Sequence, residues 1–179
     1  MDPILRIIFR KFAVFALLMP LIPLGSCDST PPEYREFLRL SPAERIERMQ
    51  SLTIDRQIDY YLAGTTYAHP PMTELGDVIA EQGKEAVPHL VNRLRQESSE
   101  SRQLDLMYVF RHMNRWNYDL RDEKEALGLL REVTANMKDH RDVAERVLRD
   151  ILESRPVNLQ RLKEEHPDYF PPANIKKPR

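Results

Sequence analysis

Glycine and cysteine are both scarce in this sequence, and each scarcity excludes a group of folds. The 179 residues include five glycines and one cysteine. A single cysteine cannot form an intramolecular disulfide, and so few glycines disfavour the Gly-rich loops of cofactor-binding folds. Runs of alternating β-branched residues are also few, which disfavours an all-β fold. The sequence therefore predicts an all-α domain whose core needs neither a disulfide nor a metal.

Patterns of catalysis and metal binding are missing as well. The chain has no Gly-x-Ser-x-Gly and no His-Glu-x-x-His, and its five histidines are spread singly. Acidic pairs such as Glu164-Glu165, or Asp150 with Glu153, fit a solvated helix surface better than a pair for acid-base chemistry. We therefore expect no metal and no cofactor, and a noncatalytic protein rather than an enzyme.

An excess of charge of one sign is also absent. The chain has 27 basic and 28 acidic residues, for a formal net charge of −1. A nucleic-acid-binding domain usually has a basic excess focused on one face. We therefore expect no nucleic acid among the partners.

Long apolar runs are absent except for one near the N-terminus. Residues 12–24 contain no charge and follow three basic residues, which is the charged and then apolar order of an export signal. The run is shorter than the ~20 residues that a membrane-spanning helix needs. It also contains Pro20 and Pro23, which disturb a helix. An export signal therefore explains this segment better than a permanent transmembrane helix.

The last residue of this run and the three that follow it, Leu24-Gly25-Ser26-Cys27, resemble the lipobox of bacterial lipoproteins. The resemblance implies that residues 1–26 are a signal peptide, cut off before Cys27. It also implies that the Cys27 thiol receives a diacylglyceryl group and that the new amino group is acylated, for example with palmitate. Two or three acyl chains anchor a protein durably in a bilayer. The alternative is a free cysteine buried in an ordinary core.

The resemblance also bears on location and charge. Asp28, directly after the lipidated position, resembles the signal that retains some lipoproteins in the inner membrane, which favours that membrane, facing the periplasm, over the outer one. Removal of residues 1–26 takes away three basic and one acidic residue, so the formal charge changes from −1 to −3.

The chain after Cys27 divides into a tether, a helical domain and a tail. The paired prolines of residues 28–33 predict an extended tether, which with its flanks covers residues 27–40. The helical domain is expected over residues 41–165 and an irregular, proline-rich tail over 166–179.

Several helix boundaries are predicted within this domain. Ser41-Pro42-Ala43-Glu44 is a capping box that starts a helix over about 42–50. Thr53 caps a second helix that Gly64 ends in left-handed geometry, before a loop over 65–71. Asp122 caps a later helix, and a last long helix runs over about 141–154.

The middle of the chain predicts an αα-hairpin. One helix with Leu75, Val78 and Ile79 inward stops at Gly83, and a second follows at once. Its residues Ala86, Val87, Pro88 and Leu90, after Gly83, resemble the Gly-x-x-Ala-Val-Pro-x-Leu start of the second helix of a HEAT-like repeat. The resemblance implies an α-solenoid fragment of stacked helical hairpins. A further helix, capped by Ser98 or Ser99 and carrying Leu104, Met107, Tyr108 and Arg111, is expected as the first helix of a next unit.

Two segments are candidates for a working surface. The first collects Arg111, Arg115, Trp116, Tyr118 and Arg121, which are residue types that dominate protein-contact hot spots. Its alternative interpretation is that the aromatic rings close the end of the helical stack and the arginines surround them. The second candidate, residues 60–71, carries three tyrosines and His69, although such tyrosines usually pack between helices.

These observations favour a periplasmic lipoprotein, anchored to the bilayer through Cys27, that acts as a noncatalytic protein-interaction module for another envelope protein. The alternative is an envelope enzyme or small-ligand binder that uses a polar site near residues 65–71 or 111–121. Convergent polar groups in a pocket would favour the alternative, and a shallow groove lined by Trp116 or tyrosines would favour the interaction module.

The lipobox resemblance gives a first testable prediction. Cys27→Ser should leave an uncleaved precursor without lipid, because the thiol that accepts the diacylglyceryl group is lost. Intact-mass measurement of the wild-type protein should show cleavage before Cys27 and added acyl mass. A wild-type protein that keeps residues 1–26 and an unmodified Cys27 would contradict the resemblance.

Overall fold

The structure, a computed structural model, describes residues 30–114, 116, 118–154, 156 and 161. The predicted signal peptide, Cys27, Asp28, Arg115 and residues 166–179 lie outside the described residues. The described part is helical without strands, which confirms the all-α prediction. Its elements are α2 (Pro32–Arg39), α3 (Pro42–Gln50), α4 (Ile54–Tyr67), α5 (Leu75–Ala80), the 3₁₀ turn η1 (Gly83–Glu85), α6 (Ala86–Gln96), α7 (Glu100–Met113), the 3₁₀ turn η2 (Leu120–Asp122), α8 (Lys124–Asn136) and α9 (Arg141–Glu153).

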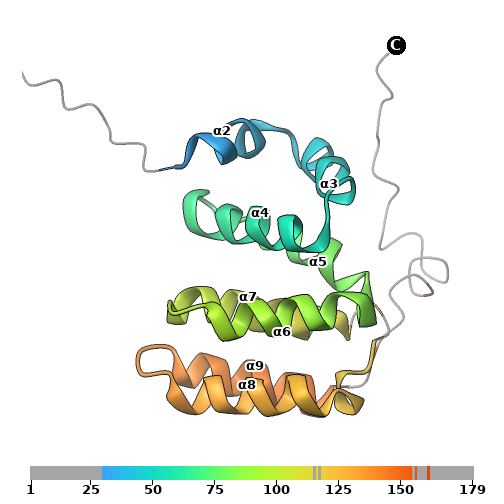
Figure 1. Cartoon of the computed structure of the whole chain (residues 1–179), viewed down its shortest axis with the longest axis vertical. Coiled ribbons are helices and arrows are strands. Elements are labelled where there is room, and N and C mark those ends of the chain that lie inside the picture. The colour runs from blue at the N-terminus through green and yellow to red at the C-terminus, as the bar shows by residue number, and fades with distance from the viewer. Residues whose placement is uncertain (1–29, 115, 117, 155, 157–160, 162–179) are drawn as a thin grey trace, which may run out of the picture.

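The helices lie in successive layers (Figure 1). α4 packs with α5, α6 with α7, and α8 with α9, while α2 and α3 cover the first layer. Contacts between layers run in two rows, because α4, α6 and α8 contact one another in sequence and so do α5, α7 and α9. Each layer therefore buries the apolar face of the next.

The predicted hairpin of residues 75–94 is wrong in its pairing. α5 and α6 follow each other across η1 but make few contacts, since α5 belongs to the layer of α4 and α6 to the layer of α7. The left-handed backbone expected at Gly64 is found at Gly83 instead, with φ of 53°. The short turn there carries the chain from one row to the other instead of folding the second helix back on the first. The apolar residues of both segments, among them Leu75, Ile79 and Leu90, are buried as predicted.

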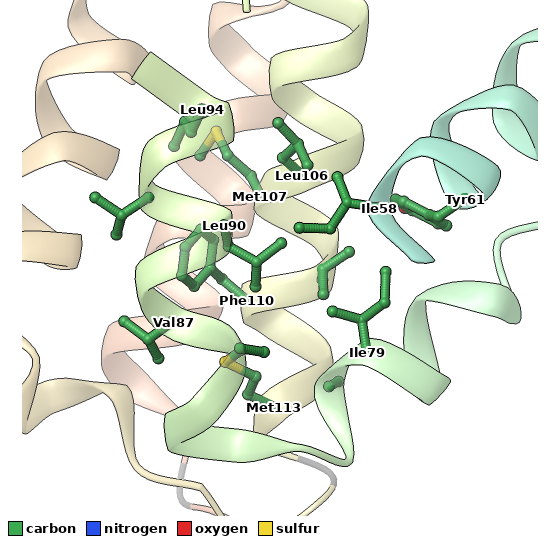
Figure 2. Close-up of a cluster of buried hydrophobic side chains, with 14 of the residues drawn as sticks. Ile58, Tyr61, Ile79, Val87, Leu90, Leu94, Leu106, Met107, Phe110 and Met113 are labelled. Atoms are coloured by element: carbon green, nitrogen blue, oxygen red, sulfur yellow. The ribbon is translucent and has the colours of Figure 1, made fainter. Parts of the chain in front are cut away.

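The core is centred on α7. Its side chains with no exposed surface are Leu106, Met107, Val109, Phe110 and Met113. Figure 2 shows several of them between side chains of α4, α5 and α6. The sequence analysis expected one inward face on this helix and selected Met107 correctly. It missed the other four, because a helix surrounded by four neighbours has apolar residues on more than one side.

The predicted tether is shorter than expected, because α2 occupies residues 32–39. Pro32 stands at the first helical position, where its missing amide donor costs nothing. Phe37 is buried and packs edge-on against Tyr60, with 4.7 Å between ring centroids. The buried Arg45 donates to the carbonyl oxygen of Leu40 at 2.7 Å, which satisfies an acceptor just after the end of α2. α2 therefore belongs to the folded domain.

The capping box at the start of α3 is confirmed. The Ser41 amide donates to Glu44 Oε2 at 2.8 Å, and the Glu44 amide donates to Ser41 Oγ. Thr53 occupies the N-cap position of α4, but its side chain makes no capping hydrogen bond.

Two other predicted boundaries are wrong. α4 continues past Gly64 to Tyr67, and the glycine instead permits a close approach of the following loop. A Cβ atom at Gly64 would lie 3.1 Å from Leu75 Cδ1. Asp122, the predicted cap of α8, belongs to η2, and Glu123 holds the N-cap position without a side-chain hydrogen bond.

The turn between α8 and α9 is held by a residue from another helix. The Glu100 carboxylate accepts from the amides of Lys138, Asp139 and His140 at 2.8, 2.9 and 3.3 Å. These backbone donors hold the pKa of Glu100 below its ordinary value. A depressed carboxylate pKa adds stability above the pKa of the unfolded chain, and this contribution is lost as the pH falls through the folded-state pKa.

The buried leucines give a stability prediction. Leu90→Ala should lower the free energy of unfolding by about 2–5 kcal/mol, because Leu90 has no exposed surface and its truncation leaves a cavity. Leu129→Ala should act in the same direction. Ile46→Ala is the control, since Ile46 is 36% exposed and should change stability by less than about 0.5 kcal/mol. Denaturant unfolding followed by circular dichroism measures all three, and equal small losses would mean that Leu90 is not in the core.

Candidate interaction surfaces

Arginines of the predicted 111–121 segment bind carboxylates of their own chain. Arg111 Nε lies 2.9 Å from Asp150 Oδ2, so this ion pair joins α7 to α9. Arg121 Nε donates to both carboxylate oxygens of Asp119, at 2.8 and 3.0 Å. Hydrogen bonds from the Arg121 side chain and amide lower the pKa of Asp119 to about 2. Arg115 lies outside the described residues, so its prediction as a contact residue stays a prediction.

The aromatic residues of the same segment pack beside the ends of helices in the middle of the stack, in the connection between α7 and η2. The ring of Tyr118 lies over Gly83, where a Cβ atom would come within 3.2 Å of Tyr118 Cδ2. The Tyr118 hydroxyl donates to Glu123 Oε1, and burial together with this hydrogen bond raises the pKa of Tyr118. Trp116 is partly buried against the core. Both rings therefore have a role in packing, as the alternative interpretation expected, although they cover helix ends along the side of the stack and not its last layer. The binding role stays a prediction.

A histidine–aspartate pair lies at the junction of α5 and α7. His112 Nδ1 is 2.7 Å from Asp77 Oδ1, and the His112 side chain is only 12% exposed. The sequence analysis treated His112 as isolated, because Asp77 is far away along the chain. The i, i+3 or i, i+4 spacing that identifies pairs within one helix gives no signal for partners on different helices.

The tyrosines of the second candidate segment are mainly structural. Tyr60 and Tyr61 are buried, and the Tyr61 hydroxyl donates to the carbonyl oxygen of Asp105 at 2.9 Å. Tyr67 is partly exposed and lines a hollow of about 190 Å³, together with Tyr34, Arg93 and Arg102 among others. Arg93 is already paired with Asp59 of α4 at 2.7 Å. The predicted groove is therefore limited to a small polar hollow at the end of α4.

A larger groove, not predicted from the sequence, separates α2 from α3 and is called the acidic groove below. Its volume of about 410 Å³ is within the ~300–1,000 Å³ range of ligand pockets. The residues that line it are Glu33, Glu36, Phe37, Leu40, Glu44, Glu47, Arg48 and Ser51. The glutamates come in two pairs spaced i, i+3, one pair on each helix. This repeated spacing is visible in the sequence and could have indicated the groove. It was not recognised because residues 27–40, which include α2, were interpreted as a tether.

Other kinds of site find no support in the described part of the chain. It contains no group of three or more histidine, cysteine, aspartate or glutamate residues placed to hold a metal ion. None of its helices has both the length and the apolar character needed to cross a membrane. No protein-family model matches the chain, and comparisons with curated proteins and with solved structures found no similar protein.

The contact between Gly83 and Tyr118 gives a prediction with a matched control. Gly83→Ala should destabilise the domain by about 1–2 kcal/mol or more, because alanine is strained at φ of 53° and its methyl group meets the Tyr118 ring. Gly128→Ala should instead stabilise it by about 0.5–1 kcal/mol, since Gly128 lies inside α8 with open space around it. Thermal and denaturant unfolding should show opposite signs for the same substitution. A neutral Gly83→Ala would contradict the described turn.

Proposed function

We propose that this chain is a bacterial lipoprotein whose helical domain is held on a membrane, facing the periplasm, by lipid on Cys27. The observation that carries the proposal is Leu24-Gly25-Ser26-Cys27 directly after an uncharged apolar run. α2 begins at Pro32, only five residues beyond Cys27. Five residues span at most roughly 18 Å, so an anchored domain would stay next to the bilayer. Asp28 favours the inner membrane.

We further propose that the domain is a HEAT-like, α-solenoid fragment that works as a noncatalytic interaction module for an envelope protein. Its support is the packing of α4 to α9 in two rows, since stacked helix pairs create extended surfaces for partners. The ion pairs between layers, such as Asp59 with Arg93 and Arg95 with Glu125, lie on the outside of the stack and leave the core apolar.

Binding is favoured over catalysis by where the perturbed carboxyl groups lie. Burial raises the pKa of Asp105, a residue of α7 that lies near the end of α4. The pKa values of Glu100 and Asp119 are instead lowered, at two separate sites on the surface. None of these three groups lines the hollows between the described helices given above. Glu44 does line the acidic groove, but its pKa is lowered by the hydrogen bonds that it accepts from Ser41 in the capping box, so this carboxylate already has a role in the fold. Acid-base catalysis needs such groups to converge on one substrate. The grooves instead offer surfaces on which a partner can lie.

The interaction is tested on Arg115, the arginine of the 111–121 segment that lies outside the described residues. Arg115→Ala should reduce the recovery of the copurifying envelope partner, because loss of a hot-spot arginine costs about 2 kcal/mol or more of affinity. The melting temperature should stay unchanged. The measurement is affinity capture of the lipidated protein from its own envelope, with the partner quantified by mass spectrometry.

Arg131→Ala provides the control, since Arg131 is an exposed arginine on α8, away from the segment. It should change neither recovery nor melting temperature. Full recovery with Arg115→Ala, combined with a lower melting temperature, would assign the 111–121 segment to the fold and leave it without a binding role.

A further inference from the structure

We propose that the acidic groove between α2 and α3 binds the basic segment Ile175–Arg179 of the same chain. This inference does not rest on lipidation or on an external partner. It assigns an occupant to a groove that the sequence analysis did not find.

The groove has an apolar floor between charged walls. Phe37 and Leu40 of the α2 region form part of its lining, between Glu33 and Glu36 on one helix and the glutamates of α3 on the other. With Arg48, the four glutamates give the groove a formal charge of −3. An occupant with an apolar residue and several cations would cover the floor and neutralise the walls.

Two of the wall carboxylates are not engaged within the described part of the chain. Glu44 accepts hydrogen bonds from Ser41 in the capping box, so its charge already has a role in the fold. Glu36 and Glu47 make no ion pair with any described residue, and both are exposed. One lies on each side of the groove. A cation placed between α2 and α3 would therefore approach both carboxylates.

The sequence contains a segment of matching chemistry. Residues 175–179 read Ile-Lys-Lys-Pro-Arg, with one apolar residue beside three cations and no acidic residue. The side chains of this segment carry a formal charge of +3, opposite in sign to the charge of the groove. Pro178 lacks an amide donor, so it suits a segment that binds through side chains instead of through helical hydrogen bonds. Ile175 would lie on the apolar floor, with Lys176, Lys177 and Arg179 toward the glutamates.

The length of chain permits this contact within one molecule. α9 and α2 lie at opposite ends of the stack (Figure 1), so the segment must pass the layers between them. Packed helices lie about 8–10 Å apart, so three steps between layers amount to roughly 30 Å. The 21 residues from 154 to 174 can span up to about 70 Å. A contact within one chain also gains from an effective concentration of about a millimolar, which populates even a weak charge-based complex.

The test measures disulfide formation in the full chain with Cys27→Ser, so that no third thiol competes and the result does not depend on lipidation. Ser51→Cys, at the lining of the groove, is combined with Asn174→Cys next to the basic segment. The control pair is Arg131→Cys with Asn174→Cys, because Arg131 is exposed on α8, outside the groove. Under mild oxidation the Ser51 pair should form an intrachain disulfide at least about tenfold faster than the control pair, as located by peptide mass spectrometry.

Charge reversal then tests the cause of the proximity. Glu36→Lys with Glu47→Lys should lower the rate of the Ser51 pair to that of the control. Lys176→Glu with Lys177→Glu, added to that variant, should restore it. Salt at about 1 M shortens the Debye length to roughly 3 Å, so it should slow the reaction in the protein that keeps Glu36 and Glu47. This measurement tests the role of charge without any charge-reversal variant.

Three outcomes would overturn the proposal. Equal rates for the Ser51 and Arg131 pairs would mean that the segment does not favour the groove. A rate that changes with neither charge reversal nor salt would mean that charge does not draw the basic segment to the groove. Disulfide dimers in place of the intrachain product would assign the groove to a second copy. None of these outcomes depends on Arg115 or on a captured partner, so the proposed function would stand or fall separately.

Discussion

The burial of α7 is the constraint on which the rest of the domain depends. Five of its side chains have no exposed surface, and each buried aliphatic or aromatic side chain contributes about 1.5–3 kcal/mol. An exposed ion pair contributes only about 0–1 kcal/mol, so pairs such as Asp55 with His89 adjust the fit of α4 on α6 without holding the stack together. The close packing around α7 requires Gly76, where a Cβ atom would lie 3.2 Å from Tyr61 and 3.5 Å from Val109. α4, α5 and α7 therefore meet at one point where a larger residue does not fit without a shift.

This arrangement limits where binding can occur. The apolar faces of the layers from α4 to α9 are buried against one another. Among the described residues, the only large apolar side chain that is exposed is Ile46 on α3. Two surfaces outside this apolar packing remain as candidates for binding. One is the acidic groove beside α2 and α3, and the other is the end of α7, where Tyr118 covers Gly83. The first would lie next to the bilayer if Cys27 is lipidated, which would bring the groove close to the membrane proteins that such an anchor favours as partners.

Local signals in the sequence were enough for many of the helices but not for their pairing. The Ser41 capping box and the helix stop near Gly83 each act within a few residues, and the structure contains both. α2 was missed because paired prolines suit both an extended tether and a helix start, and the burial of Phe37 against Tyr60 decides between them. The acidic groove was missed with it. The contacts of Arg111 with Asp150 and of His112 with Asp77 join helices that are distant in sequence, so no local spacing predicts them. The pairing of Arg121 with Asp119, two residues away, was within reach of sequence analysis.

The central claim, that α7 organises the stack, is tested most directly by native-state hydrogen exchange measured with increasing denaturant. The account predicts that amides of α7 exchange only through global unfolding, with the highest protection in the chain, and that amides of α2 and α3 exchange earlier through local opening at the margin. Protection in α7 equal to or lower than that in α2 would contradict the account, because the helix could then open while the layers around it remained folded.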